Sequence, residues 1–348
     1  KETMTIQQHA SFDSSAAELN ATSKLVKAWE SKNVKNAAKA GGISMMALSL
    51  AACGGSSTTT TTATTTTTTT TTTTDAAQAL TLTSRGDAIT GGTGNDTIDG
   101  ALVNEGGVAN VQTLTSTDII DGGAGTDTLS VTYTTALTPF SIVNVENITL
   151  TDADAATETL NFVNVTGMEQ LTLLSMTTAG DVDNIANIVT LNLTNNTVAN
   201  DIDYAAAAVA GTADAQTINL SSHTAGTLTL DAGIESATIN SLGGATNVMT
   251  LTATGVATVN ITGATAFTGT FGTAATTINA GTATAVMNIT QTGAQISNIT
   301  TGSAADTIDL SGNFVDGTTA ASVDTVAAGD GIDRLILTAA EAAAVTTA

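Results

Sequence analysis

The sequence predicts an all-β fold, a parallel β-solenoid of short strands, preceded by an N-terminal leader that is helical or disordered. Two observations predict the solenoid: short strings of alternating apolar and polar residues fill the chain, and they recur at steps of roughly twenty residues. The composition agrees, because only 3% of the 348 residues are aromatic and there is one proline. Thin repeating layers that each bury a few aliphatic side chains need few aromatic residues.

The N-terminal part of the chain, 1–53, is predicted to be a leader. Residues 24–39 carry five of the six lysines, and the apolar run that follows, 43–50, is too short to span a bilayer. It ends in Leu-Ala-Ala-Cys, which resembles the lipobox of bacterial lipoproteins and implies lipidation of Cys53. The stretch before this tetrad is longer than lipoprotein signals usually are. The alternative is an amphipathic helix and a linker of small residues, with Cys53 unmodified.

Residues 54–79 are predicted to be a linker. Positions 58–74 are all threonine except Ala63, so this stretch has almost no apolar surface to bury. β-branched threonine disfavours a helix and favours an extended chain. The segment would therefore act as a spacer between the leader and the following domain.

Residues 136–300 are predicted to form the turns of the solenoid. Each string has apolar residues at i, i+2 and sometimes i+4, separated by Thr or Asn, which is the pattern of a strand with one buried face. The aligned aliphatic positions include Leu150, Leu173, Leu193, Ile239, Ile261, Ile278 and Ile299. A β-sandwich is the alternative, but it usually has more aromatic residues and less self-similarity. The repeated Asn-x-Thr triplets match a glycosylation sequon, and we favour stacked Thr and Asn ladders on a sheet face instead.

A second pattern, with a period of nine residues, occupies 80–135 and returns in 301–348. The unit Gly-Gly-x-Gly-x-Asp-x-apolar-x is complete at 91–99 and at 122–130. Partial copies space other aspartates by nine or eighteen residues, as in the eighteen between Asp306 and Asp324. Glycine permits the tight turn, aspartate supplies a hard anionic oxygen, and the apolar residue starts the next strand in the core.

This unit resembles the nonapeptide of RTX calcium-binding proteins, and residues 80–340 resemble RTX-type surface-layer proteins and adhesins of Gram-negative bacteria. The resemblance implies a parallel β-roll with Ca²⁺ held in its turns. It also implies that loops eighteen residues apart share an ion on the same side of the roll, which would place Asp306 and Asp324 together. The turn residues it implies are Asp87, Gly91, Gly92, Gly94, Asp96, Asp118, Gly122, Gly123, Gly125, Asp127, Asp306, Asp324, Asp330 and Asp333. Because the copies do not continue as a long array, and alanines replace the leading glycines of 327–333, we expect a few ions.

The charge balance favours cations as partners. Asp and Glu number 31 against 8 Lys and Arg, whereas nucleic acid or an anionic membrane needs a basic patch. A phosphate-binding loop at 91–96 is disfavoured by its negative surroundings and by the missing GxGxxG spacing. The sequence has no recognisable Ser-His-Asp, Cys-His or zinc-ligand pattern, and His9 and His223 are each expected at the surface or rim. We therefore expect a protein that is not an enzyme.

Together these patterns predict an extracellular structural protein of the Gram-negative cell surface, stabilised by Ca²⁺ and self-associating into a surface layer or filament. A lipid anchor or a cell-surface polysaccharide would attach it. One alternative is an adhesin, in which one face of the solenoid binds a glycan or another partner. A polysaccharide-degrading enzyme on a β-helix is the third reading, although the aromatic residues that stack sugars are scarce. The export route stays open, since a lipobox implies general secretion and RTX proteins usually carry a C-terminal signal.

Overall fold

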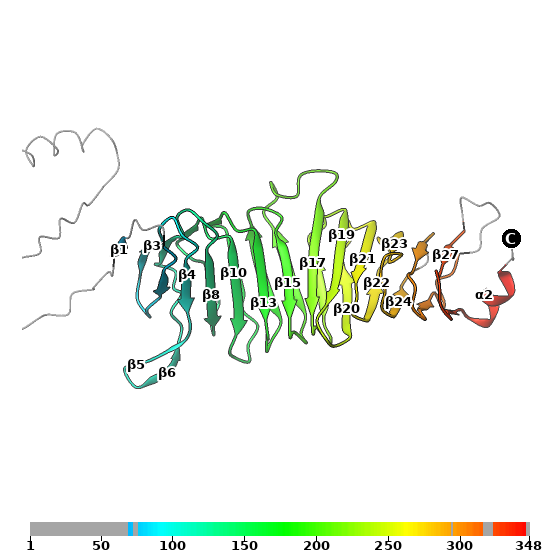
Figure 1. Cartoon of the computed structure of the whole chain (residues 1–348), viewed down its shortest axis with the longest axis horizontal. Helices are drawn as coiled ribbons and strands as arrows, with labels where there is room; N and C mark the ends of the chain where they lie inside the picture. Colours follow the sequence, from blue (N-terminus) through cyan, green and yellow to red (C-terminus); the bar gives the residue numbers. More distant parts are fainter. Residues whose placement is uncertain (1–68, 72–75, 294, 316–322, 346–348) are drawn as a thin grey trace, which may run out of the picture. The chain divides into compact units, whose positions relative to one another are not determined.

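The computed structural model describes residues 69–71, 76–293, 295–315 and 323–345, which form a parallel β-solenoid (Figure 1). This confirms the fold class predicted from the sequence. The leader, Cys53, His9 and 54–68 of the predicted linker lie outside the described residues. None of the helices in the described ranges is long and apolar enough to cross a membrane.

Three parallel sheets run along the solenoid. Sheet I contains β1 (Thr69–Thr71), β3 (Ala88–Thr90), β7 (Ile119–Asp121), β9 (Ser141–Val143) and β12 (Val165–Thr166). Sheet II contains β2 (Ala79–Thr81), β4 (Thr97–Gly100), β8 (Thr128–Tyr133), β10 (Asn147–Asp152), β13 (Gln170–Leu174), β15 (Thr190–Thr194), β17 (Ala215–Ser221), β19 (Ser236–Leu242), β21 (Thr258–Gly263), β23 (Thr277–Asn279), β25 (Asn298–Thr300) and β27 (Thr325–Ala327). Sheet III contains β11 (Thr159–Asn161), β14 (Gly180–Ile185), β16 (Asn200–Tyr204), β18 (Thr227–Leu230), β20 (Asn247–Thr252), β22 (Phe267–Phe271), β24 (Met287–Gln291), β26 (Thr307–Asp309) and β28 (Arg334–Ile336).

Sheet II continues along the whole solenoid, but the strands that alternate with it along the chain belong first to sheet I and later to sheet III. From β2 to β10 the chain alternates between sheets I and II, so half a turn takes nine residues where the nine-residue unit is intact. Strand β11 then opens sheet III, β12 ends sheet I, and from β13 onward the chain alternates between sheets II and III. β1, which lies in the predicted linker, pairs in parallel with β3 as the first strand of sheet I.

A β-hairpin interrupts the regular succession of turns. Leu80 pairs with Ile98, eighteen residues on, but Ile98 pairs with Leu129, thirty-one residues on. The additional residues form β5 (Val103–Glu105) and β6 (Val108–Val111), an antiparallel pair that projects from the solenoid (Figure 1). The hairpin is held to the preceding turn by an exposed ion pair of 3.1 Å between Arg85 and Glu105.

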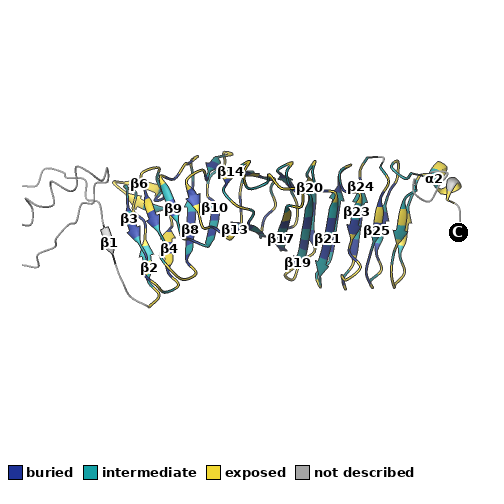
Figure 2. Cartoon of the chain, turned by 90° about the horizontal axis from the view of Figure 1, so that it is seen from above, coloured by how far each residue is buried: buried dark blue, intermediate teal, exposed yellow. Residues whose placement is uncertain are grey.

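The core lies between the sheets, and buried residues alternate with more exposed ones along most strands of the three sheets (Figure 2). The seven aligned aliphatic residues from Leu150 to Ile299 are all buried, as the alternation predicts. Ile98 and Leu129, each two positions after an aspartate of a complete nine-residue unit, are buried as well. Leu335 is 43% exposed because it lies in β28, the outermost strand of sheet III in the described chain.

The predicted polar ladder is present on the outer face of sheet II. The Asn219 amide donates to Asn192 Oδ1 at 2.8 Å, and the Asn240 amide donates to Asn219 Oδ1 at 2.7 Å. The Thr262 hydroxyl extends the row by donating to Asn240 Oδ1 at 2.6 Å. Side-chain ladders of this kind stabilise sheets of many strands that twist little.

A short helix, α2 (Ala339–Ala344), follows the last strand. Its capping box joins Thr338 and Glu341, and the Glu341 carboxylate also accepts the N–H groups of Gly312 and Phe314 at 3.1 and 3.2 Å. The last two bonds hold the helix against the loop that follows β26. The hydrogen bond from the Thr338 N–H lowers the pKa of Glu341 most, and the bonds from Gly312 and Phe314 lower it further.

Candidate metal centre

The two complete glycine-rich units stack on each other along one edge of the solenoid. Residues 91–96 connect β3 to β4 and 122–127 connect β7 to β8, one turn later. The Gly91 N–H donates to the Asp121 carbonyl at 2.7 Å, and a Cβ on Gly91 would lie 1.9 Å from the Gly122 carbonyl oxygen. Glycine is therefore required at this position because two turn backbones touch each other, since Gly91 does not have a positive φ.

The aspartates of these units form hydrogen bonds between turns. Asp96 Oδ1 accepts the Gln78 N–H at 2.8 Å, and Asp127 Oδ1 accepts the Asp96 N–H at 2.7 Å. Glu146 continues the series by accepting the Asp127 N–H at 2.7 Å. In this carboxylate ladder (Asp96, Asp127 and Glu146), each side chain satisfies a buried amide of the turn before it through a short, charge-assisted bond.

Other predicted aspartates take part in similar bonds elsewhere along the solenoid. Asp118 accepts the Asp87 N–H at 2.9 Å, and Asp333 accepts the Asp306 N–H at 2.9 Å. Asp306 in turn accepts the Met287 N–H at 2.8 Å, and Asp324 accepts the Ser297 N–H at 2.6 Å. Asp330 is exposed.

The spacing prediction for Asp306 and Asp324 is wrong. Asp306 precedes β26 of sheet III and Asp324 precedes β27 of sheet II, so they lie at the starts of strands in different sheets. The turn is twenty-seven residues long here, as the pairing of Ile299 with Val326 shows, and Asp306 stacks on Asp333 instead. The connections between strands are longer here, so aspartates that stack on each other are twenty-seven residues apart and not eighteen.

Asp127 retains one buried oxygen that can take a cation. The side chain has no measurable exposure, and Oδ2 has no hydrogen-bond partner among the described residues. Burial raises the pKa of Asp127, and the charges of Asp96, Glu146 and Asp121 raise it further. A buried carboxylate among three other carboxylates is stabilised in its charged form by a bound cation. Asp306 Oδ2 is also buried and unpartnered in the described structure.

A second acidic group was missed in the sequence. Oxygen atoms of Asp152, Asp154 and Glu158, at the end of β10 and in the loop that follows it, lie within 4.8 Å of one another, so that this group could hold a metal ion. Burial raises the pKa of Glu158, and the charges of Asp154 and Asp152 raise it further. The sequence DADAATE (152–158) places three acidic residues among seven, which could have indicated this group. It was missed because the stretch lacks the glycines of the nine-residue unit.

Glu158→Gln is expected to stabilise the calcium-free protein by about 0.5–1 kcal/mol, because it removes like-charge repulsion from a partly exposed group. Urea unfolding followed by circular dichroism, with a chelator present, measures the change. Glu105→Gln serves as the control, since it breaks the ion pair with Arg85 and is expected to be neutral or destabilising. Destabilisation by Glu158→Gln without calcium would contradict the repulsion.

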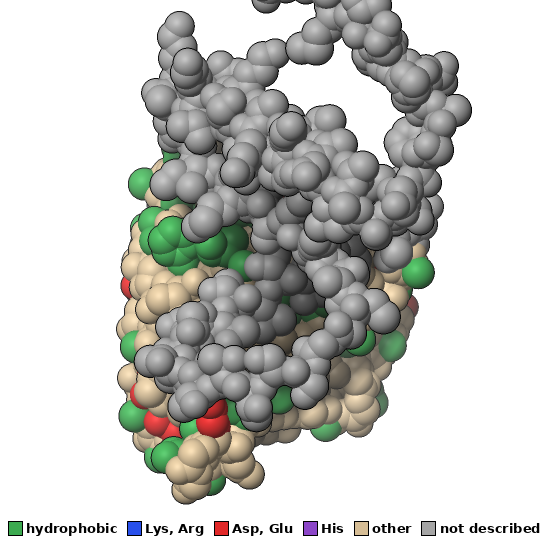
Figure 3. Space-filling view, turned by 90° about the vertical axis from the view of Figure 1, so that its left-hand side faces the viewer, with side chains coloured by type: hydrophobic (Ala, Val, Ile, Leu, Met, Phe, Trp, Pro, Cys, Tyr) green, Lys and Arg blue, Asp and Glu red, His purple; other side chains and the backbone are tan. Residues whose placement is uncertain are grey.

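Five further aspartates gather on the outer face of sheet III. They are Asp181 and Asp183 on β14, Asp201 and Asp203 on β16, and Asp231 after β18. The pKa values of Asp183, Asp201 and Asp203 are raised by burial and then by their neighbours' charges. Acidic side chains also reach the surface at the N-terminal end of the solenoid (Figure 3). The surface charge is therefore concentrated on particular faces and edges.

His223 is buried, contrary to the sequence prediction of a surface or rim position. It lies in the turn between β17 and β18 and is 1% exposed. Neither ring nitrogen has a hydrogen-bond partner in the described ranges, and burial lowers its pKa to about 4. Its backbone is fixed by an N–H bond of 2.9 Å to Asn247 Oδ1.

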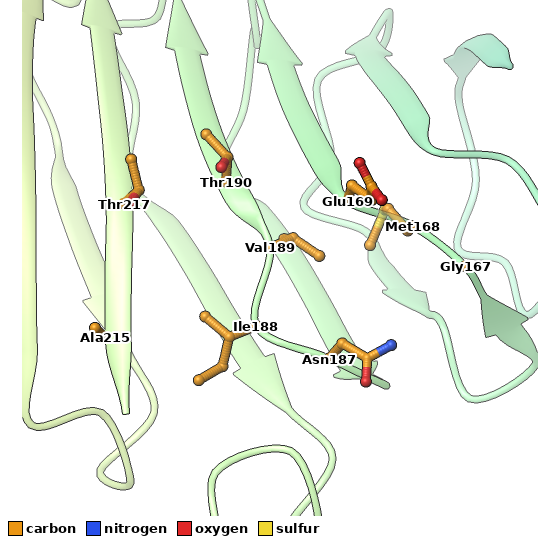
Figure 4. A pocket seen from close by; sticks show the side chains of 9 residues that line it. All are labelled: Gly167, Met168, Glu169, Asn187, Ile188, Val189, Thr190, Ala215 and Thr217. Carbon is orange, nitrogen blue, oxygen red and sulfur yellow. The ribbon is translucent and has the colours of Figure 1, made fainter. Parts of the chain in front are cut away.

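An open groove of about 400 Å³ lies near the point where sheet I ends (Figure 4). Its lining is Gly167, Met168, Glu169, Asn187, Ile188, Val189, Thr190, Ala215 and Thr217. Glu169 is the one titratable side chain of this lining, so the groove offers no pair of groups for acid–base chemistry.

Comparison with known protein families, with characterised proteins and with solved structures finds no match to this chain. The β-solenoid fold and the geometry of its turns are therefore the basis for inferring its function.

Proposed function

We propose that this chain is a structural protein of the bacterial cell surface whose solenoid is stabilised by Ca²⁺ bound in its turns. The β-solenoid fits a structural or adhesin-like role, since it presents long, repetitive outer faces. The observation that carries the calcium proposal is the buried, unpartnered Oδ2 of Asp127, which lies among other carboxylates.

The residues at this turn suit calcium chemically. Ca²⁺ binds six to eight oxygen atoms from carboxylates and backbone carbonyls. Asp127 would supply a carboxylate oxygen, with Asp121 and Glu146 close enough to raise its pKa and the glycine-rich turns adjacent. Bound Ca²⁺ would neutralise part of this negative charge. The carboxylates would still accept the hydrogen bonds from the backbone N–H groups of the preceding turns.

Calcium would couple folding to the location of the protein. Within the described solenoid, Arg85 and Arg334 are the only basic residues, so the ionised turns repel one another with little internal compensation. A ligand that binds only the folded state stabilises it by mass action. Extracellular calcium at millimolar concentration would favour the stacked turns, and a calcium-poor cytoplasm would keep the chain less folded before export.

Chelation of calcium tests this proposal. With a site dissociation constant of about 0.1 mM, about 10 mM Ca²⁺ is expected to stabilise the fold by about 2.7 kcal/mol for each site. Thermal melting followed by circular dichroism, with Ca²⁺, Mg²⁺ or a chelator, measures the effect. Identical melting in all three conditions would overturn the proposal.

Variants identify the site. Asp127→Asn keeps the Oδ1 acceptor for the Asp96 N–H but replaces the unpartnered oxygen with an amide, so it is expected to lose much of the calcium response. Asp99→Asn removes the same charge from an exposed position on β4 and is expected to retain that response. Equal responses of the two variants would place the calcium elsewhere.

A further inference from the structure

The outer face of sheet II carries no charged side chain from β8 to β25. Its outward residues are Thr128, Ser130, Thr132, Asn147, Thr149, Thr151, Gln170, Thr172, Leu174, Thr190, Asn192, Thr194, Ala215, Thr217, Asn219, Ser221, Ser236, Thr238, Asn240, Leu242, Thr258, Asn260, Thr262, Thr277, Asn279, Asn298 and Thr300. This neutral face (the outward residues of these nine strands) spans most of the length of sheet II.

The other surfaces of the solenoid carry acidic residues or, as in sheet III from β18 to β24, offer a shorter run of strands without outward charges. The chain has a net charge of −23. Acidic residues lie along the turns beside sheet II, and five aspartates occupy part of the outer face of sheet III. Approach of two copies through those surfaces brings like charges together, which disfavours association, whereas the neutral face avoids this cost.

The polar groups of the neutral face are partly satisfied before any partner arrives. Asn219 and Asn240 each donate an amide hydrogen to one neighbouring strand and accept a hydrogen bond from the other. Asn192 likewise donates to Thr172 Oγ1 at 3.2 Å. Removing water from a polar group is less costly when that group already has a hydrogen-bond partner within the protein.

The face is large enough for a specific interface. Nine strands spaced about 4.8 Å apart, with four to five residues each, cover roughly 40 Å by 15 Å. Two such faces together would bury roughly 1,200 Å², at the lower end of the range for stable protein–protein interfaces.

We infer that the neutral face of sheet II is the surface through which two copies of this chain associate. Because each copy presents the same face, the contact is isologous and relates the two copies by a twofold axis. The inference rests on the proposed structural role but not on calcium binding. Chelation and mass measurements therefore test the two ideas separately.

The full chain in calcium-containing buffer is examined by sedimentation equilibrium over a range of concentrations. The wild type is expected to dimerise with a micromolar dissociation constant, as suits an interface at the lower end of the size range. Thr238→Arg places a charge on the neutral face and is expected to weaken dimerisation at least tenfold. Thr149→Arg, on β10, is a second variant on the same face.

Thr290→Arg, on the outer face of sheet III, is the matched control and is expected to dimerise like the wild type. All three substitutions make the net charge less negative. If general repulsion controlled association, all three would therefore strengthen it, and that outcome would overturn the inference. A monomeric wild type at all concentrations, or equal weakening by Thr238→Arg and Thr290→Arg, would also overturn it. Thermal melting confirms that each variant is folded.

Discussion

Replacing Gly122 with alanine is expected to destabilise the N-terminal turns by at least about 3 kcal/mol, because a Cβ there would lie 1.9 Å from the Asn144 carbonyl oxygen. The nearest atom belongs to backbone, so no side-chain rotation relieves the clash, and the next nearest is the buried Oδ2 of Asp127 at 2.7 Å. The substitution must separate two stacked turns and weaken the bond of 3.0 Å from the Gly122 N–H to the Val143 carbonyl. Urea unfolding with a chelator present measures the loss independently of calcium.

Gly244→Ala is the control for this substitution. A Cβ on Gly244 would meet no atom within 4 Å, so alanine there is expected to be neutral or slightly stabilising. Similar unfolding curves for Gly122→Ala and Gly244→Ala would contradict the close stacking of the turns.

Acid is expected to destabilise the wild type through His223, by about 3 kcal/mol between pH 7.5 and pH 4. Burial lowers its pKa to about 4 from an ordinary value of 6.5. The unfolded chain therefore takes up a proton below about pH 6.5, whereas the folded chain resists protonation until about pH 4. The stability that neutral His223 contributes is complete above pH 6.5 and is lost as the pH falls through this window.

His223→Leu isolates this contribution from carboxylate protonation. Leucine cannot take up a proton, and the aspartates that titrate in the same range are present in both proteins. The variant is expected to gain about 3 kcal/mol relative to the wild type as the pH falls to about 4. The measurement is urea unfolding at several pH values, and a constant difference between the two proteins would show that His223 titrates normally.

Local sequence patterns predicted the strands and the core because a period of two residues determines which side chains face inward. The alternation at 147–150 correctly predicts that Ile148 and Leu150 are buried, and the nine-residue unit correctly predicts the burial of Ile98. These features depend on a few adjacent residues. They needed no knowledge of which turn stacks on which.

Features that depend on stacking could not be predicted from the same patterns. The hairpin at 103–111 makes the step from Ile98 to Leu129 thirty-one residues, so sequence spacing does not reveal the partner turn. Glu146 continues the carboxylate ladder from outside either complete nine-residue unit. His223 has a polar neighbourhood in sequence and lies in a turn whose next two residues are exposed, but its own side chain is buried in the fold.

The compact winding of the turns has a mechanical consequence. Leu171 and Leu191 are paired across adjacent turns, so twenty residues advance the solenoid by one strand spacing of about 4.8 Å. The same twenty residues reach roughly 65–70 Å when fully extended. Because each turn contacts only its neighbours, tension along the axis would peel turns away singly, and each would release roughly 60 Å of chain. A tethered solenoid would thus yield to load in steps, and each step would lengthen the chain and limit the force on its anchor.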